Sequence, residues 1–473
     1  MTHAQAHQAH QAHPAQPPAH TTSPGRLDRL ALIVLALAQA MLVLDVTVVN
    51  VALPVMSAEL GLATSLAGWA VAAYAVPFGG LLLLGGRLTD VLGSRRMLLA
   101  GLGIFTLASL AAGLATSAEW FLAARALQGV GAALLSPAAL ATLLHRFQGS
   151  ARHRALAVWG AVGGAGAAVG VLVGGLLAGG PGWRWIFFVN VPVGVLVAVA
   201  IVAFSVAPRV ARRKERVDVA GALLATAGIG SLVAALTATS TGEVLLPAGL
   251  AVLGIALLLA FVAVERRSAQ PLVRLGLARS RPVATGSLLM LVATGLLVGG
   301  LFMFSFELQA GAGWSPIATG LAFLPVSVAI VAGSHTAGRL VGRIGPRIVG
   351  SVALLVAGIG LGVTATAITA GWPEATAIVG MTVAALGLGG AFVCASTTAL
   401  GGVDEAEAGA ASGLLNSFHE LGSAAGVAGL GAIAALGIGV GFQAAAAAAV
   451  VAAILAVALI APGVPRSSAH FVH

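Results

Sequence analysis

The chain has 473 residues, of which 59% are hydrophobic and only 8% are charged. A soluble domain carries about 25% charged residues, so this composition excludes a soluble globule, and the long apolar runs exclude general disorder. The apolar runs do not alternate and the chain has a single tyrosine, which together exclude an outer-membrane barrel. We therefore predict an all-α polytopic membrane protein.

Apolar runs of the length needed to cross a bilayer recur along the whole chain. We predict fourteen spans, at 30–53, 66–85, 97–116, 119–143, 154–179, 185–206, 218–238, 244–264, 282–308, 315–338, 347–370, 374–398, 409–437 and 439–461. Because fourteen is an even number, both termini lie on the same side of the membrane.

Basic residues are distributed unevenly among the loops between these spans. Of the 24 Lys and Arg residues, all but Arg125 and Arg184 fall in alternate loops and at the two ends of the chain. This asymmetry follows the positive-inside rule and predicts that these loops and both termini face the cytoplasm. The formal charge of +9 therefore reflects membrane topology, and we expect no nucleic-acid partner.

The N-terminal segment 1–29 is rich in His, Ala, Gln and Pro and has no apolar signal sequence. We predict a disordered cytoplasmic tail. Metal binding by its histidines is the alternative, because neutral imidazoles ligate zinc or nickel. Elsewhere we expect no metal site, and the single cysteine, Cys394, excludes an intrachain disulfide.

An internal repeat divides the chain. The segments Gly86–Arg95 and Gly338–Arg347 share Gly, Arg, Leu, Gly and Arg at the same offsets, and each leads out of a predicted span. The spans then form two six-helix halves, 30–206 and 282–461. An inserted pair of helices with basic linkers occupies 207–281, and 462–473 is a cytoplasmic tail. Two six-helix halves are typical of transporters that rock about a central site.

Five segments resemble motifs of the major facilitator superfamily. Gly86–Arg96 is similar to the cytoplasmic loop signature of that family, and Leu44–Pro54 to the first-helix signature of its fourteen-helix drug–proton antiporter branch. The other three are Arg125–Gly131, Trp183–Pro192 and Ser412–Asn416. The resemblance covers the whole chain except the tail.

The resemblance implies a proton-coupled exporter in the bacterial cytoplasmic membrane that needs no cofactor other than the proton and is not an enzyme. We expect a monomer whose partners are membrane lipid and a cationic or amphipathic drug-like substrate. Two alternatives stay open. The same fold can transport a specific metabolite or a self-made antibiotic, or the chain is a membrane scaffold that transports nothing.

Asp45 lies inside the first span, where a carboxylate costs about 3 kcal/mol and usually lines a water-filled path. We predict that it binds the coupling proton. Arg125, at a similar depth in the fourth span, is its expected partner, and the family motif associates this arginine with coupling. Gln128 shares the face of Arg125, three residues on. The alternative is an ion pair that only locks two helices together.

Two further groups follow from the motifs. One is a conformational latch that comprises Gly86, Asp90, Gly93, Arg95 and Arg96. The alternative is that these residues form only a solvated turn. The other is a smooth face of the fifth span for close helix packing: Gly163, Gly166, Gly170, Gly174 and Gly175. Val171 stands where the family's antiporter motif has proline, so the motif's link to export is weaker here.

Several polar residues inside the spans are candidates for the substrate cavity: Asn50, Gln128, Glu307, Gln309, Asn416, His419 and Glu420. Glu307 replaces the tyrosine that the family usually carries and His419 replaces an arginine. Glu420 is too deep to reach the interface easily, which favours a cavity position. Glu307 can instead extend to the outer interface, and His419 can instead form a hydrogen bond between helices.

Overall fold

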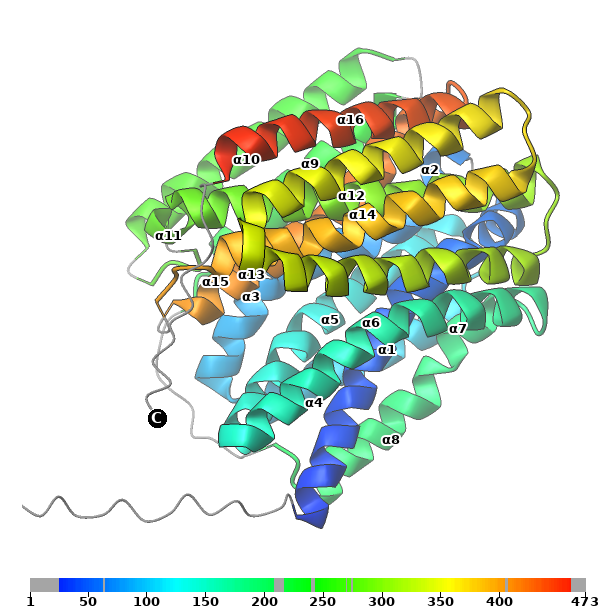
Figure 1. The fold of residues 1–473 in the computed structure, drawn as a ribbon. Helices are drawn as coiled ribbons and strands as arrows, with labels where there is room; N and C mark the ends of the chain where they lie inside the picture. The colour runs from blue at the N-terminus through cyan, green and yellow to red at the C-terminus, as the bar shows by residue number, and fades with distance from the viewer. Residues whose placement is uncertain are drawn as a thin grey trace, which may run out of the picture.

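The structure, a computed structural model, describes residues 25–62, 64–207, 217–239, 243–268, 270–273, 275–404 and 407–460. The predicted tails and the basic linker at 208–216 lie outside these residues, apart from the last few residues of the N-terminal tail. Within them all regular structure is helical. Figure 1 shows long helices that lie alongside one another.

The first half comprises α1 (Arg26–Leu60), α2 (Thr64–Ala67), α3 (Trp69–Leu92), α4 (Ser94–Gly113), α5 (Ala118–Arg146), α6 (Gly149–Gly179), α7 (Arg184–Phe188) and α8 (Asn190–Ala203). Helix α1 begins four residues before the predicted span. Asp28 explains this early start, because its carboxylate accepts a hydrogen bond from the N–H of Gly25 at 3.3 Å and caps the helix.

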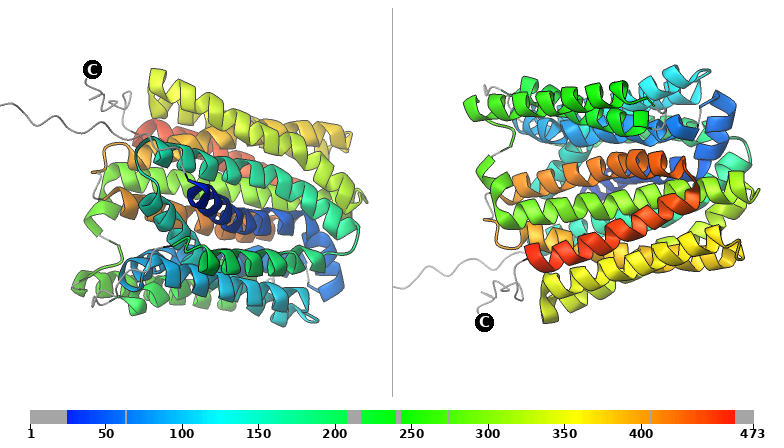
Figure 2. Two further views of the ribbon diagram at one scale, coloured as in Figure 1. Left: turned by 90° about the horizontal axis from the view of Figure 1, so that it is seen from below. Right: turned by 90° about the horizontal axis from the view of Figure 1, so that it is seen from above.

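The segment between the halves contains α9 (Val219–Ala238), α10 (Leu245–Arg267) and the short α11 (Leu275–Arg279). Helices α9 and α10 pack against each other, and α9 also packs against α3 and α15. Figure 2 shows this green pair at one edge of the molecule.

The second half comprises α12 (Arg281–Phe306), a π-helical turn η2 (Glu307–Gly311), α13 (Pro316–Thr369), α14 (Glu374–Leu400), α15 (Ala408–Ala434) and α16 (Ile438–Leu459). Helix α13 contains a sharp break at Gly345, which has φ 80° and ψ 158°. Only glycine adopts this backbone region without strain.

The two copies of the sequence repeat share this break. Gly93, between α3 and α4, has φ 91° and ψ 141°. Gly345 occupies the same place in the second copy and has nearly the same angles. The repeated sequence therefore produces a repeated backbone turn, between α3 and α4 in the first half and inside α13 in the second half.

Twelve helices in the described residues are long and apolar enough to cross a membrane, with α13 counted as one and α15 not included. Dividing α13 at Gly345 and adding the 27-residue α15 gives the predicted fourteen. The number of spans stays a prediction, since only composition and length distinguish a span from a buried helix here.

The two halves meet along α3 with α15 and α6 with α13, and α1 also packs against α12 and α13. In Figure 1 the blue-to-teal helices of the first half lie below the yellow-to-red helices of the second. Polar residues on the facing sides of α1, α3 and α15 therefore lie near the junction.

Candidate functional site

Asp45 of α1 and Arg125 of α5 form an ion pair inside the first half. The guanidinium Nη1 donates to Oδ2 of Asp45, and the side chain of Asp45 is 0% exposed and that of Arg125 1%. The two residues, which were predicted to lie at similar depths, are thus in direct contact. Two charges so fully removed from water need further hydrogen bonds to offset their desolvation.

Those hydrogen bonds come from residues of α3, α5 and α8. Gln128 of α5 donates from Nε2 to Oδ1 of Asp45 at 3.0 Å, and its Oε1 accepts from Arg125 at 2.9 Å. Asn190 of α8 also donates to Oδ1, at 3.2 Å. The Nε of Arg125 donates to the carbonyl of Ala70 on α3 at 3.0 Å. Three side chains therefore donate to the one carboxylate of Asp45, which offsets its desolvation.

Ser109 of α4 connects this network further. Its hydroxyl accepts from Gln128 at 2.8 Å and from Asn190 at 3.4 Å, and donates to the carbonyl of Phe105 at 2.8 Å. Neither Ser109 nor Asn190 was predicted from the sequence as a site residue. Asn190 lies in the segment that resembles the family motif, so that motif was its available signal. A serine within an apolar helix carries no comparable signal.

Aromatic rings cover the arginine. The guanidinium carbon lies 4.5 Å from the ring centre of Tyr74 and 5.8 Å from that of Phe187. A cation over an aromatic face is stabilised by the ring's quadrupole, and more strongly where water is excluded. Phe187 packs edge-on against Phe121 and Trp183, which close the site on that side.

Glu420 and Asn416 of α15 lie apart from the ion pair, on the face toward α3. A Cβ atom on Gly79 would lie 2.8 Å from Cβ of Glu420, and one on Gly413 would lie 2.8 Å from Leu83. Asn416 shares this face by its spacing and is exposed. These two cavity candidates therefore lie where the halves meet.

His419 points elsewhere. Its Nδ1 lies 3.1 Å from the hydroxyl of Thr294 on α12, and its ring is tilted against Phe392. Both contacts are within the second half, so His419 binds two helices of one half together. This arrangement matches the alternative role considered for it, a hydrogen bond between helices.

Asn50, Glu307 and Gln309 lie near the end of the halves that is remote from the termini. Asn50 is buried and donates back to the carbonyl of Val46 at 3.0 Å. Gln309, in the π-helical turn, donates to the carbonyl of Val51 at 2.7 Å and so joins the two halves. Glu307 is half-buried in the same turn. Gln309 thus bridges α1 and the turn that follows α12, a role that the sequence did not reveal.

The predicted latch residues gather at the opposite end, around the break between α3 and α4. Gly93 donates to the carbonyl of Thr89 at 3.0 Å and Arg96 to that of Leu92 at 3.2 Å. Asp90 and Arg96 are exposed, and Gly86 and Arg95 are partly buried.

Four of the five glycines on α6 make close helix contacts. A Cβ atom on Gly166, Gly170 or Gly174 would come within 2.9 Å or less of an atom of α1. One on Gly175 would lie 2.7 Å from the carbonyl of Pro316 on α13, in the other half. Gly163 differs from the expectation, since nothing lies within 4 Å of its Cβ position, and so it makes no close contact.

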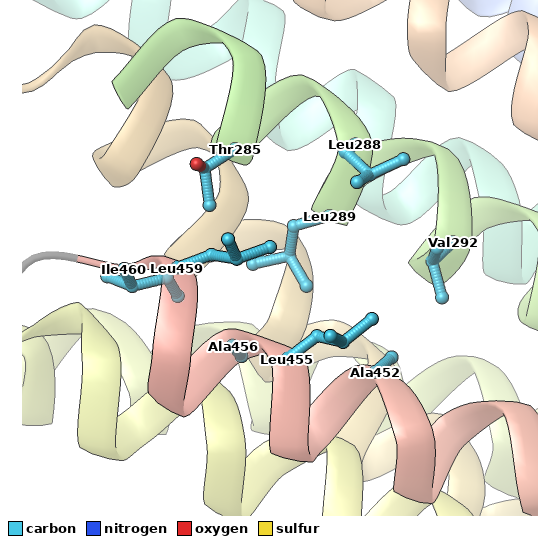
Figure 3. Close-up of a pocket in the computed structure, with 9 residues that line it drawn as sticks. All are labelled: Thr285, Leu288, Leu289, Val292, Ala452, Leu455, Ala456, Leu459 and Ile460. Carbon is cyan, nitrogen blue, oxygen red and sulfur yellow. The ribbon is translucent and has the colours of Figure 1, made fainter. Parts of the chain in front are cut away.

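A separate groove lies between α12 and α16 (Figure 3), and its cavity volume is about 40 Å³. Eight apolar residues and Thr285 line it. None of the predicted site residues is among them, and a groove without charge has no part in proton coupling. In the described residues no group of three or more His, Cys, Asp and Glu side chains could hold a metal ion.

Two repeated helical halves that meet near a buried ion pair define a membrane-embedded secondary transporter. Residues 35–427 match the model of the Major Facilitator Superfamily, and the chain belongs to this family. Its members are transporters and not enzymes.

Curated relatives and a solved structure agree with this assignment. The chain is 41% identical over 411 residues to the puromycin resistance protein pur8 of Streptomyces alboniger, covering 84% of this chain and 80% of the relative. It is 38% identical to the cephamycin export protein CmcT of Amycolatopsis lactamdurans, covering 84% and 83%. The crystal structure of a D-xylose–proton symporter superposes with a TM-score of 0.66 at 15% identity, covering 92% of this chain and 98% of the symporter. The last likeness concerns the fold alone.

Proposed function

We propose that this protein exports drug-like or amphipathic small molecules across the bacterial cytoplasmic membrane in exchange for protons. Both termini face the cytoplasm in this proposal. Relatives named for puromycin resistance and for cephamycin export support an antibiotic-like substrate. An inward proton carries charge down the membrane potential, worth about 2.3 kcal/mol per 100 mV, and this can drive a solute outward.

The observation that carries the proposal is the ion pair of Asp45 and Arg125. Arg125 keeps its proton at any physiological pH. Asp45 is therefore the group of the pair that can take up and release a proton. Protonation removes the negative charge that pairs with Arg125 and that the amides of Gln128 and Asn190 stabilise, so proton binding would loosen contacts among α1, α5 and α8.

The contacts between the halves support alternating access. At the end remote from the termini, Gln309 bonds to Val51 and Gly175 packs on Pro316. Toward the other end of α6, nothing lies within 4 Å of a Cβ position on Gly160 or Gly163. We therefore assign this structure to an inward-facing state, closed at its outer end.

A susceptibility panel in an exporter-deficient bacterial host tests the export proposal. Expression of the protein should raise resistance to several antibiotics, and a protonophore should raise their accumulation to the level of the empty vector. A host that expresses the protein at the membrane and resists no compound on the panel would point to a metabolite as the substrate. Accumulation that a protonophore leaves unchanged would exclude proton coupling.

A further inference from the structure

The two main interfaces between the halves differ in how far they extend toward the inner end. One lies between α3 and α15, and the other between α6 and α13. Along the first, a Cβ atom on Gly68, Gly79 or Gly413 would lie within 2.9 Å of a side-chain atom of the partner helix. Gly68 lies next to the outer end of α3, and Gly413 is in the second turn of α15, near the inner end. The α3–α15 interface is therefore packed from its outer end to its inner end.

Helix α9 also covers the α3–α15 interface, since it packs against both helices. A Cβ atom on Gly80 would lie 2.5 Å from the hydroxyl oxygen of Thr226 on α9. Val233 of α9 belongs to one buried apolar cluster with Val76 of α3 and Ala424 of α15. The inserted helices therefore block a molecule dissolved in the bilayer from passing between α3 and α15.

Helices α6 and α13 lie side by side in Figure 1, but their interface is packed only toward its outer end. There a Cβ atom on Gly175 or Gly320 would lie within 2.8 Å of a backbone oxygen of the partner helix. Ala157 and Ala161 share the face of Gly175 by helical spacing, and both are exposed. Val331 likewise shares the face of Gly320 and is exposed. The two facing surfaces therefore separate toward the inner end.

The separated part lies at the depth of the lipid acyl chains. Ala161 is seven residues from the start of the predicted span 154–179, which is about 10 Å along the helix. One leaflet contributes about 15 Å of hydrocarbon, so Ala161 lies within the inner leaflet. The alanine and valine side chains form apolar walls at this depth, and such walls suit the apolar part of an amphipathic molecule.

Asn416 of α15 lies at the same depth, seven residues into the predicted span 409–437. Of its neighbours, Glu420 packs toward α3 and His419 toward α12 and α14. Helical spacing directs Asn416 between these two, and its side chain is exposed. Asn416 therefore faces a solvent-accessible space between the halves.

We propose that the inner part of the α6–α13 interface is a lateral entrance, through which an amphipathic substrate passes from the inner leaflet to the space that Asn416 faces. This inference rests on the proposed function and assigns the source of its substrate. Apolar surface leaves water favourably, so the bilayer concentrates an amphipathic compound at the level of this entrance. The inserted helices cover the α3–α15 interface, which makes entry from the bilayer one-sided.

The test measures labelling of an Asn416→Cys reporter, in a Cys394→Ser background of the purified full-length protein in lipid nanodiscs. Two reagents are compared. N-dodecylmaleimide dissolves in the bilayer, whereas a sulfonated, membrane-impermeant maleimide reaches the reporter through water at the inner end. Ala161→Phe adds bulk at the entrance and should slow labelling by N-dodecylmaleimide several-fold, while the rate with the sulfonated reagent stays the same. Val331→Phe makes the same change from α13 and should have the same effect.

The ratio of the two rates is the readout, because a change in the population of the inward-facing state alters both rates alike. Val169→Phe is the matched control. Val169 is an exposed residue of α6 in the outer part, where the interface with α13 is packed, so its replacement should leave the ratio unchanged.

Three results would overturn the inference. One is a reporter that only the sulfonated reagent labels. Another is a ratio that neither Ala161→Phe nor Val331→Phe changes, and the third is a ratio that Val169→Phe lowers equally. The proposed function fails on a different result, a protein that confers resistance to no compound on the susceptibility panel. If resistance is conferred while Ala161→Phe and Val331→Phe leave the ratio intact, export stands and only the lateral entrance is refuted.

Discussion

At the scale of residues, hydrogen bonds from neighbouring residues stabilise the buried ion pair more than the attraction between its two charges does. Removing two charges from water costs several kcal/mol per ion, which the Coulomb attraction alone often does not offset. Here Gln128, Asn190 and the carbonyl of Ala70 supply the additional bonds. These bonds therefore stabilise the pair in this state.

Glu420 differs from Asp45 in having no cationic partner, within hydrogen-bond or ion-pair distance, among the described residues. If the substrate is a cation, this carboxylate offsets its desolvation, because opposite charges attract strongly where water is scarce. Glu420→Gln should therefore reduce resistance to a cationic compound several-fold more than resistance to a neutral one. The readout is the minimal inhibitory concentration of both compounds in one strain.

Glu307→Gln is the comparison variant for this prediction. Glu307 lies in the π-helical turn after α12, so its neutralisation should have a smaller effect on either compound. Equal losses for the cationic and the neutral compound in the Glu420→Gln strain would instead make Glu420 a second proton site.

At the scale of elements, the repeat motif specifies a turn as well as two helices. The last glycine of each copy, Gly93 or Gly345, adopts a positive φ with an extended ψ. A residue with a Cβ atom in this region costs about 1–3 kcal/mol. Gly345→Ala should lower the apparent melting temperature of the purified protein, measured by the fluorescence of a thiol-reactive dye at Cys394.

Gly338→Ala is the matched control, since Gly338 lies in the same helix without a positive φ and with nothing within 4 Å of its Cβ position. We expect it to leave the melting temperature unchanged or to raise it slightly, because alanine favours a helix over glycine. Equal melting temperatures for the two variants would mean that the break at Gly345 is not required.

The helices themselves were predictable because apolar runs and basic loops are strong local signals. The details that depend on packing were not. The π-helical turn at Glu307–Gly311 and the division of the sixth span into α7 and α8 leave no pattern in the sequence. Gly163 has the spacing of the packing glycines but lies where α6 has no close neighbour.

At the scale of the whole molecule, one side-chain hydrogen bond joins the two halves. The carbonyl of Val51 on α1 accepts it from Gln309, which lies in the turn after α12. The sequence predicted Gln309 as a cavity residue, and only the packing of the two halves reveals the bridge.

Gln309→Leu should therefore favour opening of the outer end. In a Cys394→Ser background, an Asn50→Cys reporter should react several-fold faster with a membrane-impermeant maleimide added outside the cell. Gln443→Leu, at an exposed glutamine of α16, should leave the labelling rate unchanged. A rate that Gln309→Leu does not alter would show that this bond does not hold the outer end closed.

The residues around the ion pair of Asp45 and Arg125 could be predicted only in part. Arg125 and Gln128 followed from depth and helical spacing, whereas Ser109, Asn190 and Tyr74 come from three other helices whose rotation no local pattern specifies. The site is thus a product of the fold of the first half. The function that we propose for this site is proton coupling.

The measurement that tests this claim most directly is substrate transport by inverted membrane vesicles under an imposed pH gradient. We expect the Asp45→Asn variant to lose gradient-driven transport while it still inserts into the membrane. Asp28→Asn changes a carboxylate of the same helix that pairs with Arg146 at 3.0 Å near the helix end, and it should transport normally. Undiminished gradient-driven transport by well-expressed Asp45→Asn would contradict the account.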